Sequence, residues 1–481
     1  MRALSRKNLW EAAPDSVKAA VGRVLSAAPP SALLGTRFRA TRRFVDAAQW
    51  WPTERIRAYQ LEQLRRICTL AIDRSPYYRR VFREAGFAPG DLRQLEDLAR
   101  LPTIDKRTLR DHGEEMLAGP RPKHGADRVS TGGTSGEPLR FWINTGRSAI
   151  EYAYLTASWA RVGYDLRCPQ AVLRGQIVPE NRHGLRHSYD PILRRHHYSN
   201  FHMTDDNMRR YVEHIRGLGP CFLHVYPSSG AALTKFIEGS GITPPENVRA
   251  ILAGSENVYP EDRARLERVW GSRYFSWYGH SEKLVMGAEC EHSTDYHIWP
   301  TYGYFELLDE NDQPITTPGR SGEIVGTGFI NTVMPFIRYR TEDHATYVAD
   351  HCATCGRMHP VIRDVDGRWP SGALVARDGS LISMTALNVH DETFQHVRRY
   401  QFYQDTIGEA VVRVVPVNGF GEADKKRIIT TLRKRVNDRV TVTVEVCKEI
   451  PLSPRGKAIW VDQRLDVQRI TTRSLSPSGA P

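Results

Sequence analysis

The chain has 481 residues, of which 40% are hydrophobic and 25% are charged, which is enough for a well-buried core in two or three domains. Lysine and arginine exceed aspartate and glutamate by 67 − 55 = 12, but no zinc-finger spacing, aromatic RNA-binding motif or long basic block accompanies this excess, so nucleic acid is not the expected partner. We expect a cytoplasmic protein, because no apolar run of bilayer length and no signal-peptide pattern is found, and because seven cysteines do not make a disulfide framework.

Residues 1–58 are expected to form a basic leader, because they carry eleven basic and four acidic side chains. The stretch RFRATRRF (37–44) could contact an anionic membrane surface or an acidic partner. A solvated leader, partly disordered or helical, is the simpler interpretation. At most, we expect peripheral contact with a membrane.

Helices and strands are predicted to alternate through the middle of the chain. Residues 59–87 are expected to form two helices with a break at Ser75-Pro76. Strands are predicted at 128–130, 139–143, 170–178, 221–226, 248–256 and 273–282, and helices at 147–162, 205–217, after Pro227, and at 260–271. This alternation predicts a parallel sheet covered by helices, with ligands beyond the carboxyl ends of its strands.

The predicted secondary structure changes twice in the last third of the chain. Residues 300–365 are β-rich, and near Gly367-Arg368 the chain is expected to enter a smaller domain. There a strand at 408–417, a helix at 421–437 and a strand at 440–450 predict a compact β-α-β unit. The tail beyond residue 466 is expected to be disordered.

The segment STGGTSGEP (130–138) combines glycines with hydroxyl side chains and could wrap a phosphate chain. A flexible surface loop is the alternative on composition alone. It is not a Walker A loop, since no Gly-Lys-Ser/Thr follows at the required spacing. The residues in question are Ser130, Thr131, Gly132, Gly133, Thr134, Ser135 and Gly136.

Five motifs follow the loop, and the order of the whole set resembles the adenylate-forming (AMP-binding) superfamily. These five are GSE (254–256), YGHSE (278–282), a segment ending in RYRTED (338–343), DGR (366–368) and PRGK (454–457). The earlier SPYYRRVF and LPTIDKRTLR resemble the phenylacetate–CoA ligase-like branch, which includes CapK-like proteins.

The resemblance implies an α/β fold in four parts. A large adenylate-forming domain with parallel or mixed sheets and a β-rich subdomain would span 59–367, and a mobile α+β lid would span 368–466. The leader (1–58) and the tail (467–481) would flank them. A homodimer is one expected state.

The activity that the resemblance implies is the attack of a small carboxylic acid on ATP, giving an acyl-adenylate and pyrophosphate. The acyl group would then pass to CoA, an amine or a carrier protein. The developing charge has to be neutralised, and Mg²⁺ and a lysine are suited to that. By resemblance, the loop holds the β- and γ-phosphates, Glu282 holds Mg²⁺, and Lys457 bridges the acid and the α-phosphate. Arg368 stands just before the hinge between the domains.

Further nucleotide contacts are also implied by the resemblance. Asp343 would accept both ribose hydroxyls, while Ser255 and Glu256 would line the adenine. Tyr278, next to Gly279, would stack on the base, although a core tyrosine is the alternative. Arg338 and Arg340 alternate along a strand, so that one, Arg340 above all, would meet a phosphate or form a salt bridge to Glu342 or Asp343.

The acid itself is expected near YPSSG (226–230) and YGH (278–280). Tyr226 and His280 are the candidate lining residues, and His280 could contact the carboxylate of the acid. A packing histidine is the alternative.

A second site is indicated by CATC (352–355), a C-x₂-C knuckle of the kind that forms half of a zinc site. Cys290 lies near His292 and His297, and the spacing favours His297 as the fourth ligand with Cys352 and Cys355. Such a Cys₃His site would be structural, with no open position. Two reduced cysteines in a turn are the alternative.

Three departures from the family pattern concern the second half-reaction and the phosphate loop. Leu139 stands after Pro138, where a lysine is usual, and Glu342 stands where glycine is usual. The hinge reads GRWPSGA, in which Trp369-Pro370 should stiffen the backbone. This leaves two rival functions: an amide or ester ligase that does not use CoA, and a non-catalytic nucleotide-binding scaffold.

Overall fold

The computed structural model describes residues 29–122, 124–130, 139–176, 178–181, 184–366, 373–383, 387, 392–451 and 460–467. Thr131 to Gly136 of the glycine-rich loop, together with Arg368 and Lys457, lie outside these ranges. Their predicted roles stay predictions. None of the helices in the described part of the chain combines the length and apolar character needed to cross a bilayer.

Helices form the first part of the described chain. They are α3 (Pro30–Leu33), α4 (Gly35–Ala48), α5 (Thr53–Arg74), α6 (Pro76–Glu84), η1 (Pro89–Asp91), η2 (Leu95–Arg100) and α7 (Lys106–His112). The predicted break at Ser75-Pro76 is confirmed: Ser75 is the N-cap of α6 and its side chain accepts the Tyr78 N–H at 3.3 Å.

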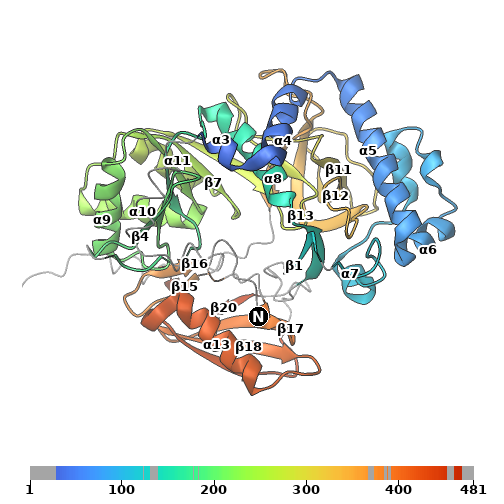
Figure 1. Ribbon diagram of the computed structural model, residues 1–481. Coiled ribbons are helices and arrows are strands. Elements are labelled where there is room, and N and C mark those ends of the chain that lie inside the picture. The colour runs from blue at the N-terminus through green and yellow to red at the C-terminus, as the bar shows by residue number, and fades with distance from the viewer. Residues whose placement is uncertain are drawn as a thin grey trace, which may run out of the picture.

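The N-terminal segment differs from the solvated leader that we expected. Phe38 and Val45 of α4 are fully buried, and α4 packs along α8 (Arg147–Trp159), as Figure 1 shows. Arg42 of α4 pairs with Asp46 and also donates to Thr156 of α8 at 3.3 Å. Residues 30–58 are therefore part of the packed body, and α5 already begins at Thr53.

A twelve-stranded mixed sheet forms the centre of the molecule, in the order β11-β12-β13-β14-β10-β9-β8-β7-β6-β3-β5-β4. One half contains the parallel strands β5 (Arg195–Tyr198), β3 (Gln170–Leu173), β6 (Cys221–Val225), β7 (Val248–Gly254) and β8 (Arg273–Gly279). The parallel arrangement that the alternation predicts is confirmed. The edge strand β4 (His187–Asp190), antiparallel to β5, was not predicted.

Both faces of this parallel half are covered by helices. On β6, Leu223 and Val225 face the core shared with α9 (Asp205–Arg216), α10 (Pro227–Ser240) and α11 (Pro260–Trp270). Phe222, which precedes Leu223, packs with α4 and α8 on the other face. Strands buried on both faces read as continuous apolar runs, which explains why CFLHVY was recognisable as a strand.

The other half is antiparallel and confirms the predicted β-rich region. Its strands are β9 (Met286–Ala288), β10 (Tyr296–Ile298), β11 (Gly303–Leu308), β12 (Ser321–Gly328), β13 (Tyr339–Ala349) and β14 (Val361–Asp366). A core from α5 and α6 packs against it. The hairpin of β1 (Ala126–Ser130) and β2 (Arg140–Asn144) flanks residues 131–138, as predicted.

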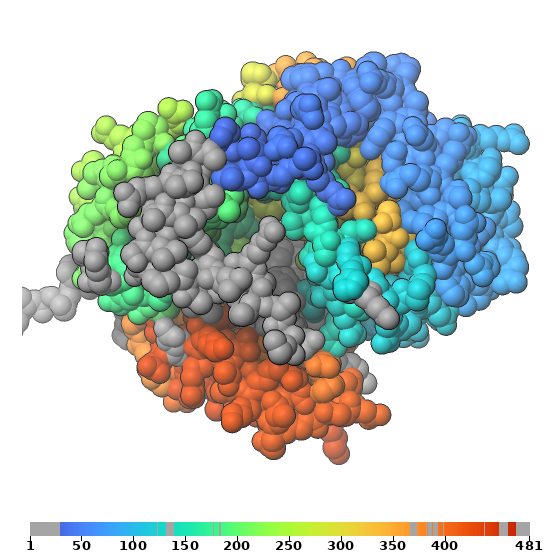
Figure 2. Space-filling model, viewed as in Figure 1, coloured from blue at the N-terminus to red at the C-terminus, as the bar shows by residue number. Residues whose placement is uncertain are grey.

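The C-terminal unit has a separate sheet, β19-β18-β17-β20, and it forms the lower part of the molecule in Figure 2. The predicted β-α-β unit is confirmed by β18 (Glu409–Pro416), α13 (Glu422–Val436) and β19 (Thr441–Val446), with parallel strands. The remaining elements are β15 (Ala373–Val375), β16 (Leu381–Ser383), η4 (Glu392–Phe394), β17 (Val397–Gln404), η5 (Asn437–Arg439) and β20 (Val461–Gln463). Arg140 of β2 contacts this unit through the Phe394 and Gln395 carbonyls, at 2.6 and 2.8 Å.

Candidate active site

Glu282 follows β8 at the point where the parallel half of the sheet meets the antiparallel half. Its side chain is buried. One carboxylate oxygen lies 3.1 Å from His280 Nδ1, and the other accepts the Tyr339 hydroxyl at 3.3 Å. Because His280 Nε2 accepts the Val285 N–H at 3.2 Å, Nδ1 carries the ring proton and donates it to Glu282.

These contacts keep Glu282 ionised and fit for a hard cation. Burial acts to raise its pKa, but the hydrogen bond from His280 and the charge of the nearby Lys106 hold the pKa below its ordinary value. An ionised carboxylate with one described hydrogen bond on each oxygen keeps lone pairs for a further ligand. Glu282 is therefore suited to the predicted role of Mg²⁺ ligand.

Asp343 lies on β13, and its Oδ2 accepts the Tyr278 hydroxyl at 2.8 Å. Burial raises the pKa of Asp343 to about 6, against the opposing effects of His280, Tyr278 and Lys106. The structure thus brings together Tyr278, proposed to contact the base, and Asp343, proposed to bind the ribose. The hydrogen bond to Asp343 fixes the position of the Tyr278 ring. Its stacking on the base stays a prediction.

Nucleotide affinity should depend on pH through Asp343. A carboxylate accepts two ribose hydroxyls only when ionised, so we expect the KM for ATP to rise as pH falls through about 6. Asp343→Asn should raise the KM about 10-fold at pH 8 and remove most of the change between pH 8 and 5.5. Steady-state kinetics over this range check the prediction. An unchanged pH profile in the variant would contradict it.

Lys106 is a site residue that the sequence analysis did not single out. It is 5% exposed, and its Nζ lies 3.5 Å from Glu342, while its charge acts on Glu282 and Asp343. Ile104 forms a parallel bridge with Tyr339, which fixes the start of α7 against β13. The motif LPTIDKRTLR contains this lysine, but burial of its ammonium beside β13 could not be seen in the sequence.

The segments that we expected around the adenine lie where the neighbouring strands β7 and β8 end. Ser255 follows β7 with a positive φ of 72°, and its Oγ accepts from Arg174 at 2.6 Å. Glu256 accepts the Ser228 N–H at 2.8 Å, which ties this exit to the first turn of α10. Gly279 is the last residue of β8 and pairs with Met286. Ser130 is buried at the end of β1.

Three residues have different contacts from those expected. Arg338 forms a buried pair with Glu306 at 3.0 Å, and its φ of 51° places it before β13 rather than in register with Arg340. Arg340 pairs with Glu323 at 2.6 Å and with Asp312, not with Glu342 or Asp343. Both ring nitrogens of His280 form contacts within the protein, with Glu282 and with the Val285 N–H, and its predicted contact with the acid stays a prediction.

The four predicted zinc ligands come together. The ligand atoms of Cys290, His297, Cys352 and Cys355 lie within 4.8 Å of one another. Nδ1 of His297 lies 3.1 Å from the Asp295 carbonyl oxygen, while its buried Nε2 has no hydrogen-bond partner among the described residues. Backbone N–H groups donate to Cys290 Sγ at 3.3 Å and to Cys352 Sγ at 3.5 Å. Three cysteine sulfurs and one histidine nitrogen are the donor set of a closed zinc site. The Asp295 carbonyl accepts the Nδ1 proton of His297, which leaves the buried Nε2 free to bind the metal.

We expect the purified protein to contain one Zn²⁺ per chain at this site. Cys352→Ser should lose the metal and lower the melting temperature, because the ligands join β10 to the segment before β14 and the metal supplies folding free energy. Atomic emission spectrometry and thermal unfolding check this. Cys68→Ser, a change at a buried cysteine in α5 outside the cluster, is the matched control. An unmetallated wild-type protein would contradict the prediction.

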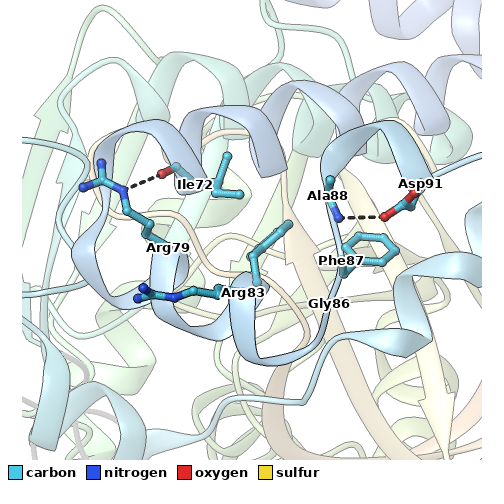
Figure 3. Close-up of a pocket in the computed structure, with 8 residues that line it drawn as sticks. Ile72, Arg79, Arg83, Gly86, Phe87, Ala88 and Asp91 are labelled. Carbon is cyan, nitrogen blue, oxygen red and sulfur yellow. Dashed lines mark hydrogen bonds between the residues drawn. The ribbon is translucent and has the colours of Figure 1, made fainter.

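A pocket of about 420 Å³ opens elsewhere, among α5, α6 and η1. Figure 3 shows its eight lining residues, none of which belongs to the carboxylate cluster: Ile72, Arg79, Phe82, Arg83, Gly86, Phe87, Ala88 and Asp91. Two of its polar side chains are engaged with the backbone, Arg79 with the Ile72 carbonyl and Asp91 with the Ala88 N–H. The chemistry-bearing residues therefore lie at the sheet edge and not in this pocket.

Comparison with known proteins agrees with this geometry. A family model described as the CapK C-terminal domain matches residues 374–464. The phenylacetate-coenzyme A ligase of Pseudomonas putida is 29% identical over 459 residues, covering 89% of this chain and 98% of the relative. The ligase of the same name from Thermus thermophilus is 26% identical over 441 residues, covering 85% and 94%.

A solved structure shares the fold. The crystal structure of 2-hydroxyisobutyryl-CoA ligase in the postadenylation state matches with a TM-score of 0.56 at 20% identity, covering 89% of this chain and 94% of that one. With the sequence relatives, it confirms the predicted α/β fold with a small C-terminal sheet domain. The predicted resemblance is confirmed as well: the chain is similar to phenylacetate–CoA ligases over most of its length, and its C-terminal part matches the CapK C-terminal domain.

Proposed function

We propose that this protein activates a small carboxylic acid with ATP, forming an acyl-adenylate and releasing pyrophosphate, and then transfers the acyl group to CoA. The observation that carries the proposal is the buried pair of carboxylates, Glu282 and Asp343, with the buried Lys106 acting on both electrostatically. The sequence relatives are named as CoA ligases, and the similar solved structure contains an acid joined to AMP. Both support the proposal.

The residues divide the task between binding and charge neutralisation. Asp343, ionised above pH 6, would accept the ribose hydroxyls, and Tyr278 holds its orientation. The acid carboxylate oxygen attacks the α-phosphorus, forming one O–P bond as the bond to pyrophosphate breaks. Lys106, and by prediction Lys457, supply positive charge to these anions. Mg²⁺ held by Glu282 would neutralise charge on the leaving pyrophosphate.

The proposal is tested by pyrophosphate release from ATP with aryl, fatty, amino and sugar acids, with hydroxylamine present to trap the acyl-adenylate. We expect release that depends on the acid and yields AMP and a hydroxamate. Adding CoA in place of hydroxylamine should give a thioester, whereas a hydroxamate without any thioester would favour the ligase that does not use CoA. ATP binding with no turnover of any acid would favour the scaffold and contradict the proposal.

A further inference from the structure

Arg174 lies at the carboxyl edge of the parallel strands, one residue beyond β3. Register places the ends of four neighbouring strands beside it: Leu173 pairs with Val225, Val225 with Ala253, and Gly254 with Trp277. Tyr226 and Ser255 are therefore the first residues beyond the next two strands. This is the edge at which open α/β sheets bind their ligands.

The guanidinium is held by neutral groups. Its Nη1 lies 2.8 Å from His224 Nε2, its Nη2 donates to Ser255 Oγ at 2.6 Å, and its carbon lies 4.7 Å from the centre of the Tyr226 ring. Since arginine only donates, His224 Nε2 is the acceptor and this histidine is neutral. Burial and the charge of Arg174 also hold the pKa of His224 well below its ordinary value.

No aspartate or glutamate in the described ranges forms an ion pair with Arg174 within 4.0 Å. Glu256 acts on Arg174 electrostatically, but both Glu256 oxygens accept from Ser228. Two of the five guanidinium donors are used by His224 and Ser255, and a further one interacts with Tyr226. A half-buried arginine with spare donors suits a carboxylate or another anion that arrives with a ligand.

The surroundings of Arg174 are rigid, as a specificity site requires. Gly175 has a φ of 55° and its N–H donates to Asn200 at 2.8 Å. A Cβ at Gly175 would come within 3.0 Å of the Tyr226 hydroxyl, so the strand exits pack directly on each other. Arg435 of α13 acts electrostatically on Tyr226, which indicates that the C-terminal unit approaches the same edge with further positive charge.

We propose that Arg174 binds a second anionic group of the acid, at the end away from the carboxylate that is activated. The substrate class is thus a dicarboxylic acid or an acid with another anionic substituent. With a neutral acyl chain, the charge of the half-buried guanidinium would be balanced only by the electrostatic effect of Glu256, which is less favourable than direct pairing with an anionic group. This inference rests on the proposed function and names the substrate class of the same site.

Matched acid pairs test it: adipate against hexanoate, and 4-carboxyphenylacetate against phenylacetate. In the wild-type protein, kcat/KM for pyrophosphate release should favour the anionic member of each pair about 100-fold. Arg174→Met, which keeps the length of the side chain, should reduce this ratio to about one, mainly by lowering kcat/KM for the anionic acids. Arg195→Met removes an arginine of the adjacent strand that stacks on Tyr152 and should leave the ratio unchanged.

Three results would overturn the inference. Equal or better use of neutral acids by the wild-type protein refutes it while the proposed function stands. The inference is also refuted if Arg174→Met, with a wild-type melting temperature, keeps the wild-type ratio of kcat/KM between anionic and neutral acids. This includes the case in which only the KM for ATP or CoA changes. Absence of release with all four acids and with the wider panel refutes the proposed function and this inference together.

Discussion

Glu282→Gln is expected to lower kcat for acid-dependent pyrophosphate release at least about 100-fold. Glutamine keeps the size of the side chain, and its amide oxygen can still accept from His280, while its NH₂ group can donate to the Tyr339 hydroxyl in place of the present bond. It removes the negative charge that a divalent cation needs. The loss should therefore fall on kcat and on the dependence on Mg²⁺ concentration, and less on the melting temperature.

The matched control for this variant is Glu151→Gln. Glu151 is a neighbouring carboxylate that pairs with Lys283 at 2.6 Å, next to Glu282 in the sequence. We expect its kcat to stay within about threefold of the wild type, since the lost pair contributes only modestly to stability. A Glu282→Gln protein with wild-type kcat and wild-type Mg²⁺ dependence would show that this carboxylate is not the cation ligand.

Lys106→Met is expected to lower kcat/KM for ATP about 10- to 100-fold. Lys106 is 5% exposed and is the described ammonium that faces Glu282, Glu342 and Asp343. Methionine fills the space of the stem, so the packing of α7 on β13 is kept. What is lost is the positive charge that allows several anions to gather at one place.

A second readout separates this charge effect from a structural one. Lys106 lowers the pKa of Asp343, so its removal should raise that pKa above about 6. The acid limb of the ATP dependence should then move to higher pH in Lys106→Met. The control Lys235→Met, at a partly exposed lysine of α10, should leave both kcat/KM and the pH profile unchanged. An unmoved acid limb in Lys106→Met would contradict the electrostatic role.

Much of the fold was predictable because parallel strands such as CFLHVY are buried on both faces and appear as continuous apolar runs. The break at Ser75-Pro76 was predictable from a local cap and a proline, which need no tertiary information. Helix α4 was misjudged for the opposite reason. Its many arginines dominate the composition, while its buried face contains few apolar residues, among them Phe38 and Val45.

The candidate site was predictable in its carboxylates and cysteines but not in its contacts. Motif order indicated Glu282 and Asp343, the C-x₂-C knuckle and its spacing indicated the Cys₃His cluster, and these sets come together. The roles of Arg338 and His280 depend on partners distant in sequence or on backbone groups, Glu306 and the Val285 N–H. A strand pattern also assumes regular backbone, and the positive φ of Arg338 breaks the alternation.

The most direct measurement of the central claim is the transfer of ¹⁸O from a carboxyl-labelled acid during turnover with ATP and CoA. Attack of the carboxylate on the α-phosphorus predicts one ¹⁸O atom in the phosphate of AMP and none in pyrophosphate, read by mass spectrometry. Label in inorganic phosphate with ADP as product would show attack at the γ-phosphate instead. That result, or unlabelled AMP, would contradict activation of the acid as an adenylate.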